Sequence, residues 1–452
     1  MTTPVLDAPI FARPSSLRPE TTERRFAWAA PAGWAMCALA GVATVAAAVF
    51  GRVSFLGTAF VLVILSGSTP ILRRVARGVE GVELVGILRF GLGLKFLAVL
   101  PRFELRQDAH DYFVAGRALV DDFLRFDFAV DPGRSIPGTG SVRYLSGLVQ
   151  LFTFQDEFAT FVVFALLGFV GAAFFVRAFV IALPAADPAR YAVLLMCWPS
   201  IVYWPSSTGK DAVMMFGLGL TAAALARLLN GHWRVLPWFL AGITVAALVR
   251  PHVALIAVTA AVAAVVLNSP SGKQGSLIGR SFVIGALAFA GTLASDGVEA
   301  AFEIQDLNVS GLGAALDLAN LRSAQGGSSF VAARIDSFGD VPWGVTTVLL
   351  RPFPHEAASI PMLVSAAEGV VLLGLLLMGL PRLTAAVGSV RREAYVGYCA
   401  VFVGVFVYLF SALGNFGILA RQRTMMTPLL LVLIALPTAR ERVRARRLAA
   451  RS

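Results

Sequence analysis

Two carboxylates and a histidine stand close together in the segment Asp108-Ala109-His110-Asp111-Tyr112. Asp108 and Asp111 are three residues apart, so in a helix they share one face and can act as a general base and its orienting partner. With His110 they could instead hold a divalent cation. The alternative to both is a solvated acidic loop. We take Asp108 and Asp111 as candidate catalytic residues and Tyr112 as a candidate substrate contact.

A second candidate is the turn Trp204-Pro205-Ser206-Ser207-Thr208-Gly209-Lys210-Asp211. Thr208 and Asp211 have capping-box spacing, which predicts a helix start. Lys210 is then a cation in a first turn, where the helix dipole disfavours it. Exposed backbone N–H groups beside a lysine suit a phosphate, whereas the alternative is a lysine that snorkels to lipid headgroups. Lys210 and Asp211 are candidate substrate-binding residues, although the glycine spacing of a Walker loop is absent.

Six further basic residues next to apolar segments are candidates for substrate binding: Arg250, His252, Arg351, His355, Arg421 and Arg423. Arg250 is expected at a helix C-terminus, where a cation is comfortable. Arg421 and Arg423 are expected at the outer N-terminus of the last span, against both the dipole and the charge bias of loops. An anionic partner would resolve both conflicts, and the planar fork of arginine suits a diphosphate.

The composition excludes an ordinary soluble domain, because 57% of the 452 residues are hydrophobic and 14% are charged. The net charge of +11 comes from basic residues in short loops and in the C-terminal tail. This pattern favours anchoring beside anionic lipid over nucleic-acid binding. Cys37, Cys197 and Cys399 lie in separate apolar runs, so neither disulfides nor a zinc site is indicated.

The expected fold is all-α, a polytopic transmembrane helical bundle of about 12 spans. The candidate spans are residues 28–50, 54–72, 84–101, 158–182, 190–206, 211–229, 235–249, 252–268, 279–296, 357–380, 394–413 and 424–437. Lysine and arginine in the short loops place both termini in the cytoplasm of a multi-pass cell-membrane protein. Residues 1–27 are then a disordered cytoplasmic tail, 28–437 the transmembrane domain and 438–452 a basic cytoplasmic tail.

Two long connections, 102–157 and 297–356, are expected on the outer face. In the first, apolar residues at helical spacing over Ala118–Val130 predict an amphipathic helix on the membrane surface. The second has a glycine-rich stretch before the interfacial segment Val341–Leu350, so it is either a lid or a plain loop. Within the spans, Arg89 and Lys95 are expected to snorkel in opposite directions, whereas Glu368 is a costly intramembrane charge.

These motifs resemble those of the GT-C membrane glycosyltransferases, the group that includes protein mannosyltransferases and aminoarabinose transferases. The resemblance covers roughly residues 84–437. It rests on the acidic outer loop, on the Trp-Pro-Ser-Ser turn with Gly209-Lys210-Asp211, and on Arg421 and Arg423 ahead of Pro428. Family members commonly place the acidic loop after their first span, whereas two extra spans precede it here.

The resemblance implies inverting transfer of a sugar from a polyprenyl-phosphate carrier to a cell-envelope glycan, lipid or protein. Asp108 or Asp111 would be the base, while Lys210, Arg421 and Arg423 would hold the carrier phosphate. Besides carrier and acceptor, the expected partner is membrane lipid and not nucleic acid; the cofactor is unknown, with a divalent cation left open.

Other functions fit parts of the pattern. An O-antigen-type polymerase or ligase would use undecaprenyl-linked glycan and depend on Arg322, Arg334 and His355 in the second loop. A lipid or solute transporter calls for midplane charges and a repeat, of which the sequence provides Glu368 and no repeat. A purely structural membrane subunit is a further alternative.

Overall fold

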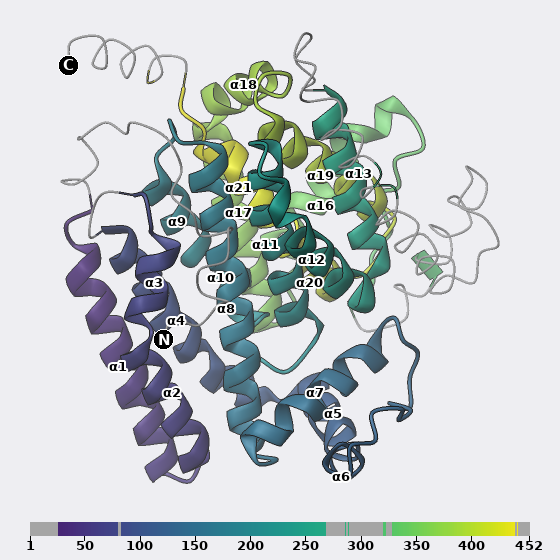
Figure 1. The fold of residues 1–452 in the computed structure, drawn as a ribbon. Coiled ribbons are helices and arrows are strands. Elements are labelled where there is room, and N and C mark those ends of the chain that lie inside the picture. The colour runs from purple at the N-terminus through teal and green to yellow at the C-terminus, as the bar shows by residue number, and fades with distance from the viewer. Residues whose placement is uncertain are drawn as a thin grey trace. The chain divides into compact units, whose positions relative to one another are not determined.

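The computed structural model describes residues 26–79, 83–267, 285, 288, 320, 321, 328–438 and 441. Within these ranges every extended regular element is a helix (Figure 1), and an isolated bridge joins Ser329 to Asn415. The all-α class is therefore confirmed for the described part of the chain. Contacts divide the chain into two compact units: residues 1–250 with 448–452, and residues 251–447.

Five helices are long and apolar enough to cross a bilayer: α1 (Ala29–Val49), α4 (Glu83–Leu105), α8 (Glu157–Ala182), α11 (Lys210–Leu229) and α17 (Ile360–Met378). Three bent pairs bring the number to eight if each is one span: α2 (Phe55–Gly67) with α3 (Thr69–Val75), α18 (Leu380–Ser389) with α19 (Ala394–Phe410), and α20 (Phe416–Arg423) with α21 (Thr427–Ala435). These helices indicate a membrane protein. The span expected at 279–296, most of the glycine-rich stretch and both predicted tails lie almost wholly outside the described residues.

The core of the first unit is built from α8, α11 and α12 (Leu236–Val249), whose backbones approach closely at small residues. Gly171 of α8 and Gly219 of α11 face each other with no room for a Cβ atom, and Gly242 of α12 meets Thr221 in the same way. Such glycines allow close packing of membrane helices without a hydrophobic driving force. A short 3-10 turn, η3 (Trp233–Val235), joins α11 to α12.

The span expected over 190–206 is wrong as a single helix. The structure has α9 (Pro188–Met196) and α10 (Pro199–Tyr203) instead, separated by Cys197 and Trp198. Pro199 lacks an N–H group and disfavours helical backbone at the residue before it, so the break falls at Trp198, which has ψ 119°. Neither piece approaches the ~20 residues that a span requires.

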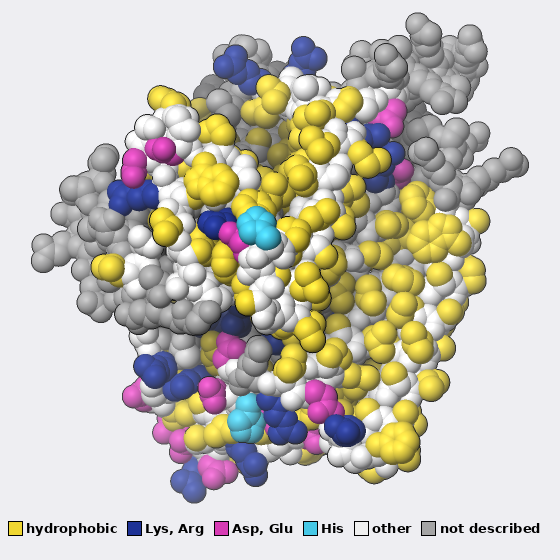
Figure 2. Space-filling model, turned by 180° about the vertical axis from the view of Figure 1, so that it is seen from behind, with side chains coloured by type: hydrophobic (Ala, Val, Ile, Leu, Met, Phe, Trp, Pro, Cys, Tyr) yellow, Lys and Arg dark blue, Asp and Glu magenta, His cyan; other side chains and the backbone are white. Residues whose placement is uncertain are grey.

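The first long connection forms three helices, α5 (Gln107–Arg117), α6 (Val120–Leu124) and α7 (Thr139–Thr153). The amphipathic helix expected over Ala118–Val130 is wrong in extent, because α6 ends after five residues. The helix ends because Phe126 adopts a positive φ of 63°, which turns the chain back. The amide of Asp127 then donates to the carbonyl of Asp122 at 3.0 Å. Figure 2 shows charged side chains gathered at the end of this unit that α5, α6 and α7 occupy, beside an apolar face on α1 and α2.

In the second unit, α13 (Pro251–Leu267) packs on α19, and α21 is buried along its whole length. The segment expected to be interfacial coincides with α16 (Val341–Leu350), which follows the turn η4 (Phe338–Asp340) and precedes η5 (Pro354–Glu356).

Candidate functional site

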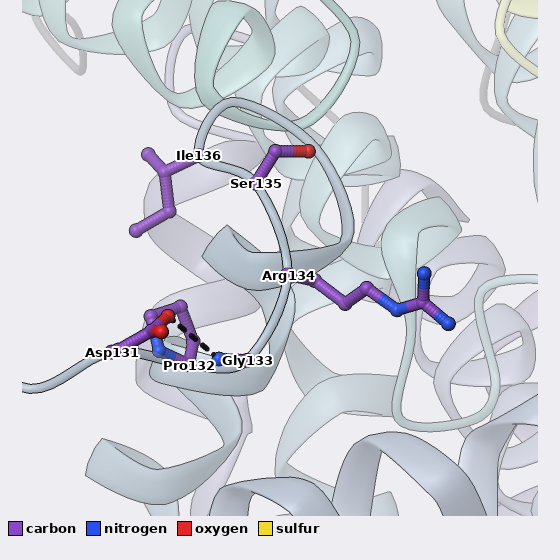
Figure 3. A pocket seen from close by; sticks show the side chains of 6 residues that line it. All are labelled: Asp131, Pro132, Gly133, Arg134, Ser135 and Ile136. Carbon is purple, nitrogen blue, oxygen red and sulfur yellow. Dashed lines mark hydrogen bonds between the residues drawn. The ribbon is translucent and has the colours of Figure 1, made fainter.

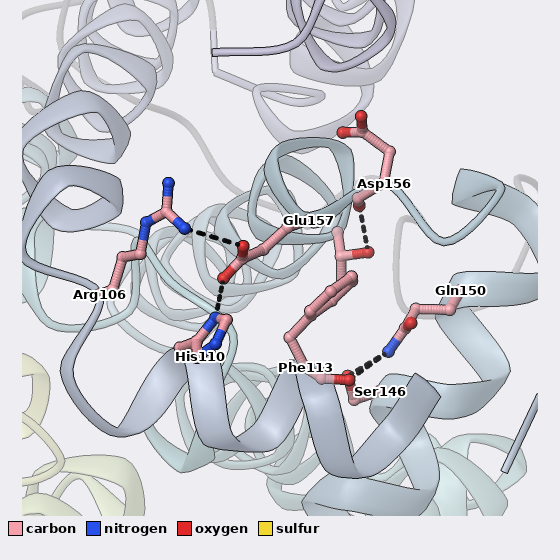
Figure 4. Close-up of polar contacts among 8 residues, drawn as sticks. Arg106, His110, Phe113, Ser146, Gln150, Asp156 and Glu157 are labelled. Atoms are coloured by element: carbon pink, nitrogen blue, oxygen red, sulfur yellow. Dashed lines mark hydrogen bonds and ion pairs between the residues drawn. The ribbon is translucent and has the colours of Figure 1, made fainter. Parts of the chain in front are cut away.

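A histidine and a glutamate from two helices meet at the acidic end of the first unit. Nδ1 of His110 on α5 lies 2.8 Å from Oε1 of Glu157, the first residue of α8. Arg106, immediately before α5, approaches the other carboxylate oxygen at 3.4 Å. Figure 4 shows Arg106 and His110 both pointing toward Glu157. The arrangement is an acid–base pair held at a helix N-terminus, where the dipole stabilises the carboxylate.

The three sequence-predicted residues of this segment occupy different environments on α5. Asp108 lies in the first turn and is half-buried, Asp111 is exposed, and Tyr112 is buried. Helical spacing therefore places the two carboxylates on one side of α5, as expected, with only Asp111 open to solvent. Their catalytic role stays a prediction.

Helix α7 links this acid–base cluster to an apolar groove. On one face, Nε2 of Gln150 donates to the carbonyl of Phe113 at 2.9 Å, and Gly147 meets Gly116 of α5 backbone to backbone. On the other face, Leu145 and Val149 contribute to a groove of about 270 Å³ between α7, α8 and α11. Apolar side chains alone line it: Leu145, Val149, Val163, Phe164, Leu166, Leu167, Val170 and Phe216.

Two buried cations of α4 hold the turn that precedes α11. Nζ of Lys95 donates to the carbonyls of Ile201 and Val202 at 2.8 and 3.3 Å. Nη2 of Arg102 donates to Oγ of Ser207 at 2.8 Å, and its guanidinium lies 4.9 Å from the ring of Tyr203. The expected snorkelling of Lys95 is wrong. Its ammonium group donates instead to carbonyls near the end of the short helix α10.

Arg89 does not snorkel either. Its guanidinium lies 3.9 Å from the centre of the Trp34 ring and donates to Oγ1 of Thr69 at 3.1 Å. The cation–π contact and the hydroxyl acceptor explain how the charge is accommodated inside the unit.

Lys210 is the first residue of α11, as expected, and its predicted role in phosphate binding stays a prediction. Residues 205–209 are buried, and Lys210 itself is half-buried. The predicted capping box is wrong: α11 begins after Gly209 with no side-chain cap, and Oγ1 of Thr208 has no hydrogen-bond partner among the described residues. Asp211 forms a buried ion pair with Arg250 at 3.2 Å, and Arg250 follows the last turn of α12, as predicted. Both are held within the protein.

In the second unit, Arg351 is enclosed by aromatic rings. Its guanidinium lies 4.3 Å from the ring of Phe330 and pairs with Glu356. The other surrounding rings are Trp343, Phe353 and Phe416, at 5.4 to 5.7 Å. Burial opposes ionisation of Glu356, but hydrogen bonds from Arg351 and from the amide of Phe353 outweigh it and hold its pKa below the ordinary value.

Arg421 and Arg423 lie in the last turn of α20, not at the start of the final helix, so the expected conflict with the dipole is wrong. Asn415 caps the start of α20, where its side chain accepts from the amide of Ile418 at 3.1 Å. Arg423 is buried, and Nη1 donates to the carbonyls of Leu349 and Arg351 at 2.6 and 3.1 Å. Arg423 therefore provides hydrogen-bond donors for the carbonyl groups at the end of α16. Arg421 is half-buried.

The two remaining candidates are histidines beside aromatic rings. His252, half-buried near the start of α13, lies 6.0 Å from the ring of Phe410, and the exposed His355 stacks 5.7 Å from Phe353. Glu368, buried on α17, interacts electrostatically with Arg423. The expected substrate-binding roles of the two histidines stay predictions.

The remaining hollow and the acidic side chains offer no second site in the described residues. Within the described residues, no three His, Cys, Asp or Glu side chains converge to hold a metal ion. A hollow of about 540 Å³ is lined by six consecutive loop residues, Asp131 to Ile136. Figure 3 shows Arg134 pointing away from Asp131, which accepts instead from the amide of Gly133. This loop brings no reactive groups together.

Sequence reasoning missed Glu157, Arg106 and Arg102 as parts of the site. Glu157 is 47 residues from His110. The available signal was the pair Asp156-Glu157 at the start of a long apolar run, which marks a helix N-terminus.

Comparisons of the chain with protein family models, with curated proteins and with solved structures find no match. The likeness to GT-C glycosyltransferases therefore rests on the sequence motifs alone.

Proposed function

We propose that the protein is an integral membrane glycosyltransferase that moves a sugar from a polyprenyl-phosphate carrier to a cell-envelope glycan, lipid or protein acceptor. We further propose that the α5–α7 end of the first unit faces outward, as the loop charges predict. The observation that carries the proposal is the two-sided packing of α7, which joins the acid–base cluster of α5 to a wholly apolar groove.

This juxtaposition matches a lipid-linked sugar. The isoprenoid tail requires an apolar groove among membrane helices, while the sugar and acceptor require acid–base groups at the membrane surface. A nucleotide-sugar would require polar surroundings throughout. Helix α8 carries Glu157 of the cluster and Val163 of the groove, so we propose that one amphiphilic substrate contacts both.

The chemical step assigns a role to each group. The acceptor hydroxyl attacks the anomeric carbon while the bond from that carbon to the carrier phosphate breaks. Asp108 and Asp111 bind or deprotonate the acceptor hydroxyl, and the half-buried Lys210 stabilises the charge that develops on the phosphate. In the second unit Arg423 is committed to the carbonyls of α16.

The alternatives find less support in the described residues. A polymerase or ligase would depend on second-loop arginines, but Arg351 pairs with Glu356 and Arg334 with Asp336; Arg322 lies outside the described residues. A transporter would use buried charges along a path, yet Lys95 donates to carbonyls within its own unit.

The test is turnover of synthetic polyprenyl-phosphate mannose, glucose and galactose by purified protein in liposomes, with an envelope extract as acceptor. Asp108→Asn, Asp111→Asn and Lys210→Gln should each lower turnover, by about 10² to 10⁴ if the aspartate is the base. Asp131→Asn, a change in the neighbouring loop, is the matched control and should behave as wild type. Release of polyprenyl phosphate at the control rate by all three site variants would contradict the proposal.

A further inference from the structure

We propose that His110 accepts the proton of the acceptor hydroxyl and that Glu157 positions it. This inference deepens the glycosyl transfer proposed above and rests on it. It gives the site a base that is distinct from Asp108 and Asp111.

The geometry fixes which ring nitrogen reacts. Nδ1 of His110 lies 2.8 Å from Oε1 of Glu157, so in the neutral ring Nδ1–H donates and the lone pair is on Nε2. Nε2 has no hydrogen-bond partner among the described residues. The His110 side chain is 45% exposed and that of Glu157 15%, so the imidazole is reachable while its partner is enclosed. A nitrogen base oriented by a carboxylate is the arrangement that hydrolase triads use to activate a hydroxyl.

The backbone around Arg106 supports a functional reading. Arg106 has φ 47°, a left-handed conformation that is costly for a residue other than glycine. This residue lies between α4 and α5, and it brings its own guanidinium and the His110 ring to the same carboxylate. Backbone strain of this kind tends to occur at functional sites, where the surrounding structure maintains it.

The charged groups around the imidazole come from α5, from the residue before it and from α8. Glu157 contacts the imidazole, Arg106 contacts Glu157, and Asp108 and Asp111 lie on the same helix as His110. Asp156, the N-cap residue of α8, accepts from Ser54 and from the amide of Ala159, while Arg117 of α5 donates to Gln155. Glu157 is therefore the carboxylate that stabilises the imidazolium formed during transfer.

In the proposed step, the acceptor oxygen forms a bond to the anomeric carbon as the carbon–oxygen bond to the phosphate breaks. The electron pair of the broken bond leaves on the phosphate oxygen, which gives polyprenyl phosphate. The hydroxyl proton moves to Nε2 of His110, and the imidazolium then loses a proton to water before the next turnover.

The experiment measures kcat/KM between pH 4.5 and 8.5 for the full-length protein in liposomes, with the polyprenyl-phosphate hexoses named above as probes. A histidine base ordinarily gives an acid limb near pH ~6.5, and an aspartate base one near pH ~4. His110→Gln should lower kcat/KM by about 10² to 10⁴ and abolish the limb near neutral pH. Glu157→Gln should lower it less, because the imidazolium formed during transfer loses its carboxylate partner. Glu157→Asp should restore part of the lost kcat/KM.

His232→Gln, which changes an exposed histidine beside η3, is the matched control. Thermal melts of each variant check folding, and His110→Asn serves as a second variant if His110→Gln is unstable. Wild-type kcat/KM in both His110 variants, or an unchanged acid limb, would overturn the role of His110 and leave the transferase proposal standing. Failure of the wild-type protein to use any of the three sugars would overturn the transferase proposal and this inference with it.

Discussion

Asp211 and Arg250 form an ion pair inside the first unit, with Oδ1 of the aspartate 3.2 Å from Nη2 of the arginine. The two side chains are only 3% and 7% exposed, so both charges are shielded from solvent. The pair joins the first turn of α11 to the residue that follows α12. Both residues were expected to bind substrate, but the contact also makes them part of the packing around the α11 N-terminus.

Removing one member of this pair should destabilise the protein strongly. Asp211→Asn leaves the Arg250 charge buried beside an amide, and a loss of this kind typically costs about 3 to 5 kcal/mol. The double change Asp211→Leu with Arg250→Met should cost less than either single change, because neither member of the pair is left buried without the other. Thermal unfolding in detergent gives the order of the variants' melting temperatures, with the exposed Arg234→Gln as control. Equal melting of Asp211→Asn and the control would contradict a structural role for the pair.

A second prediction concerns Lys95, whose ammonium donates to the carbonyls of Ile201 and Val202. Lys95→Met keeps most of the apolar stem and removes both bonds, so the end of α10 loses its partner. Hydrogen bonds to charged groups contribute roughly 1.5 to 3 kcal/mol each, which predicts a clear drop in melting temperature. The matched control is Arg73→Met, on an exposed position of α3. A drop no larger than that of the control would show that α10 holds its position without the lysine.

The third prediction is a pH dependence in the second unit. The pKa of Glu356 is lowered in the folded protein, although burial opposes this, because Arg351 and the amide of Phe353 donate to it. A lowered folded-state pKa means that the stabilisation is fully present above the unfolded-state value near 4.5 and is lost as the pH falls through the folded-state value. Below about pH 4.5, Arg351 should therefore loosen from its aromatic surroundings.

Hydrogen exchange of the peptide 341–356 at pH 7 and at pH 3.5 measures this change. The amides should exchange faster at the lower pH, after correction for intrinsic rates. Glu356→Gln should show fast exchange at both values, whereas Asp336→Asn, at an exposed neighbour, should keep the wild-type difference. An identical pH response in wild type and Glu356→Gln would contradict the prediction.

Much of the helical layout could be predicted from the sequence, because long apolar runs identify α1, α4, α8, α11 and α17 without tertiary information. The breaks were harder to predict. The polar run Arg421-Gln422-Arg423-Thr424 does not look like a helix end that precedes a bend into α21, although Asn415 is a recognisable helix cap that could have revealed where α20 begins. Missing that start placed Arg421 and Arg423 at the wrong end of a helix.

Side-chain partnerships were the least predictable part of the site. Lys95 meets a carbonyl 106 residues away, and His110 meets Glu157 across 47 residues. Neither contact has a periodic signature, since it depends on which helices pack together. Local spacing could place Asp108 and Asp111 on one side of a helix, but it could not show that Asp111 is exposed and Asp108 half-buried.

The fourth prediction tests which end of the first unit faces outward. The loop charges predict that the α5–α7 end is outside and that the turn η3, which contains Arg234, is cytoplasmic. With the exposed native Cys197 changed to serine, single cysteines at Ser135 and at Arg234 provide one probe at each end, both at exposed positions. A cysteine at Gly140 would be unsuitable, because its Cβ would collide with the carbonyl of Arg134. In intact cells an impermeant maleimide should label position 135 and spare position 234 until the membrane is opened. Labelling of 234 alone would place the acid–base cluster in the cytoplasm, where nucleotide-sugars are available, and remove the reason to expect a lipid-linked donor.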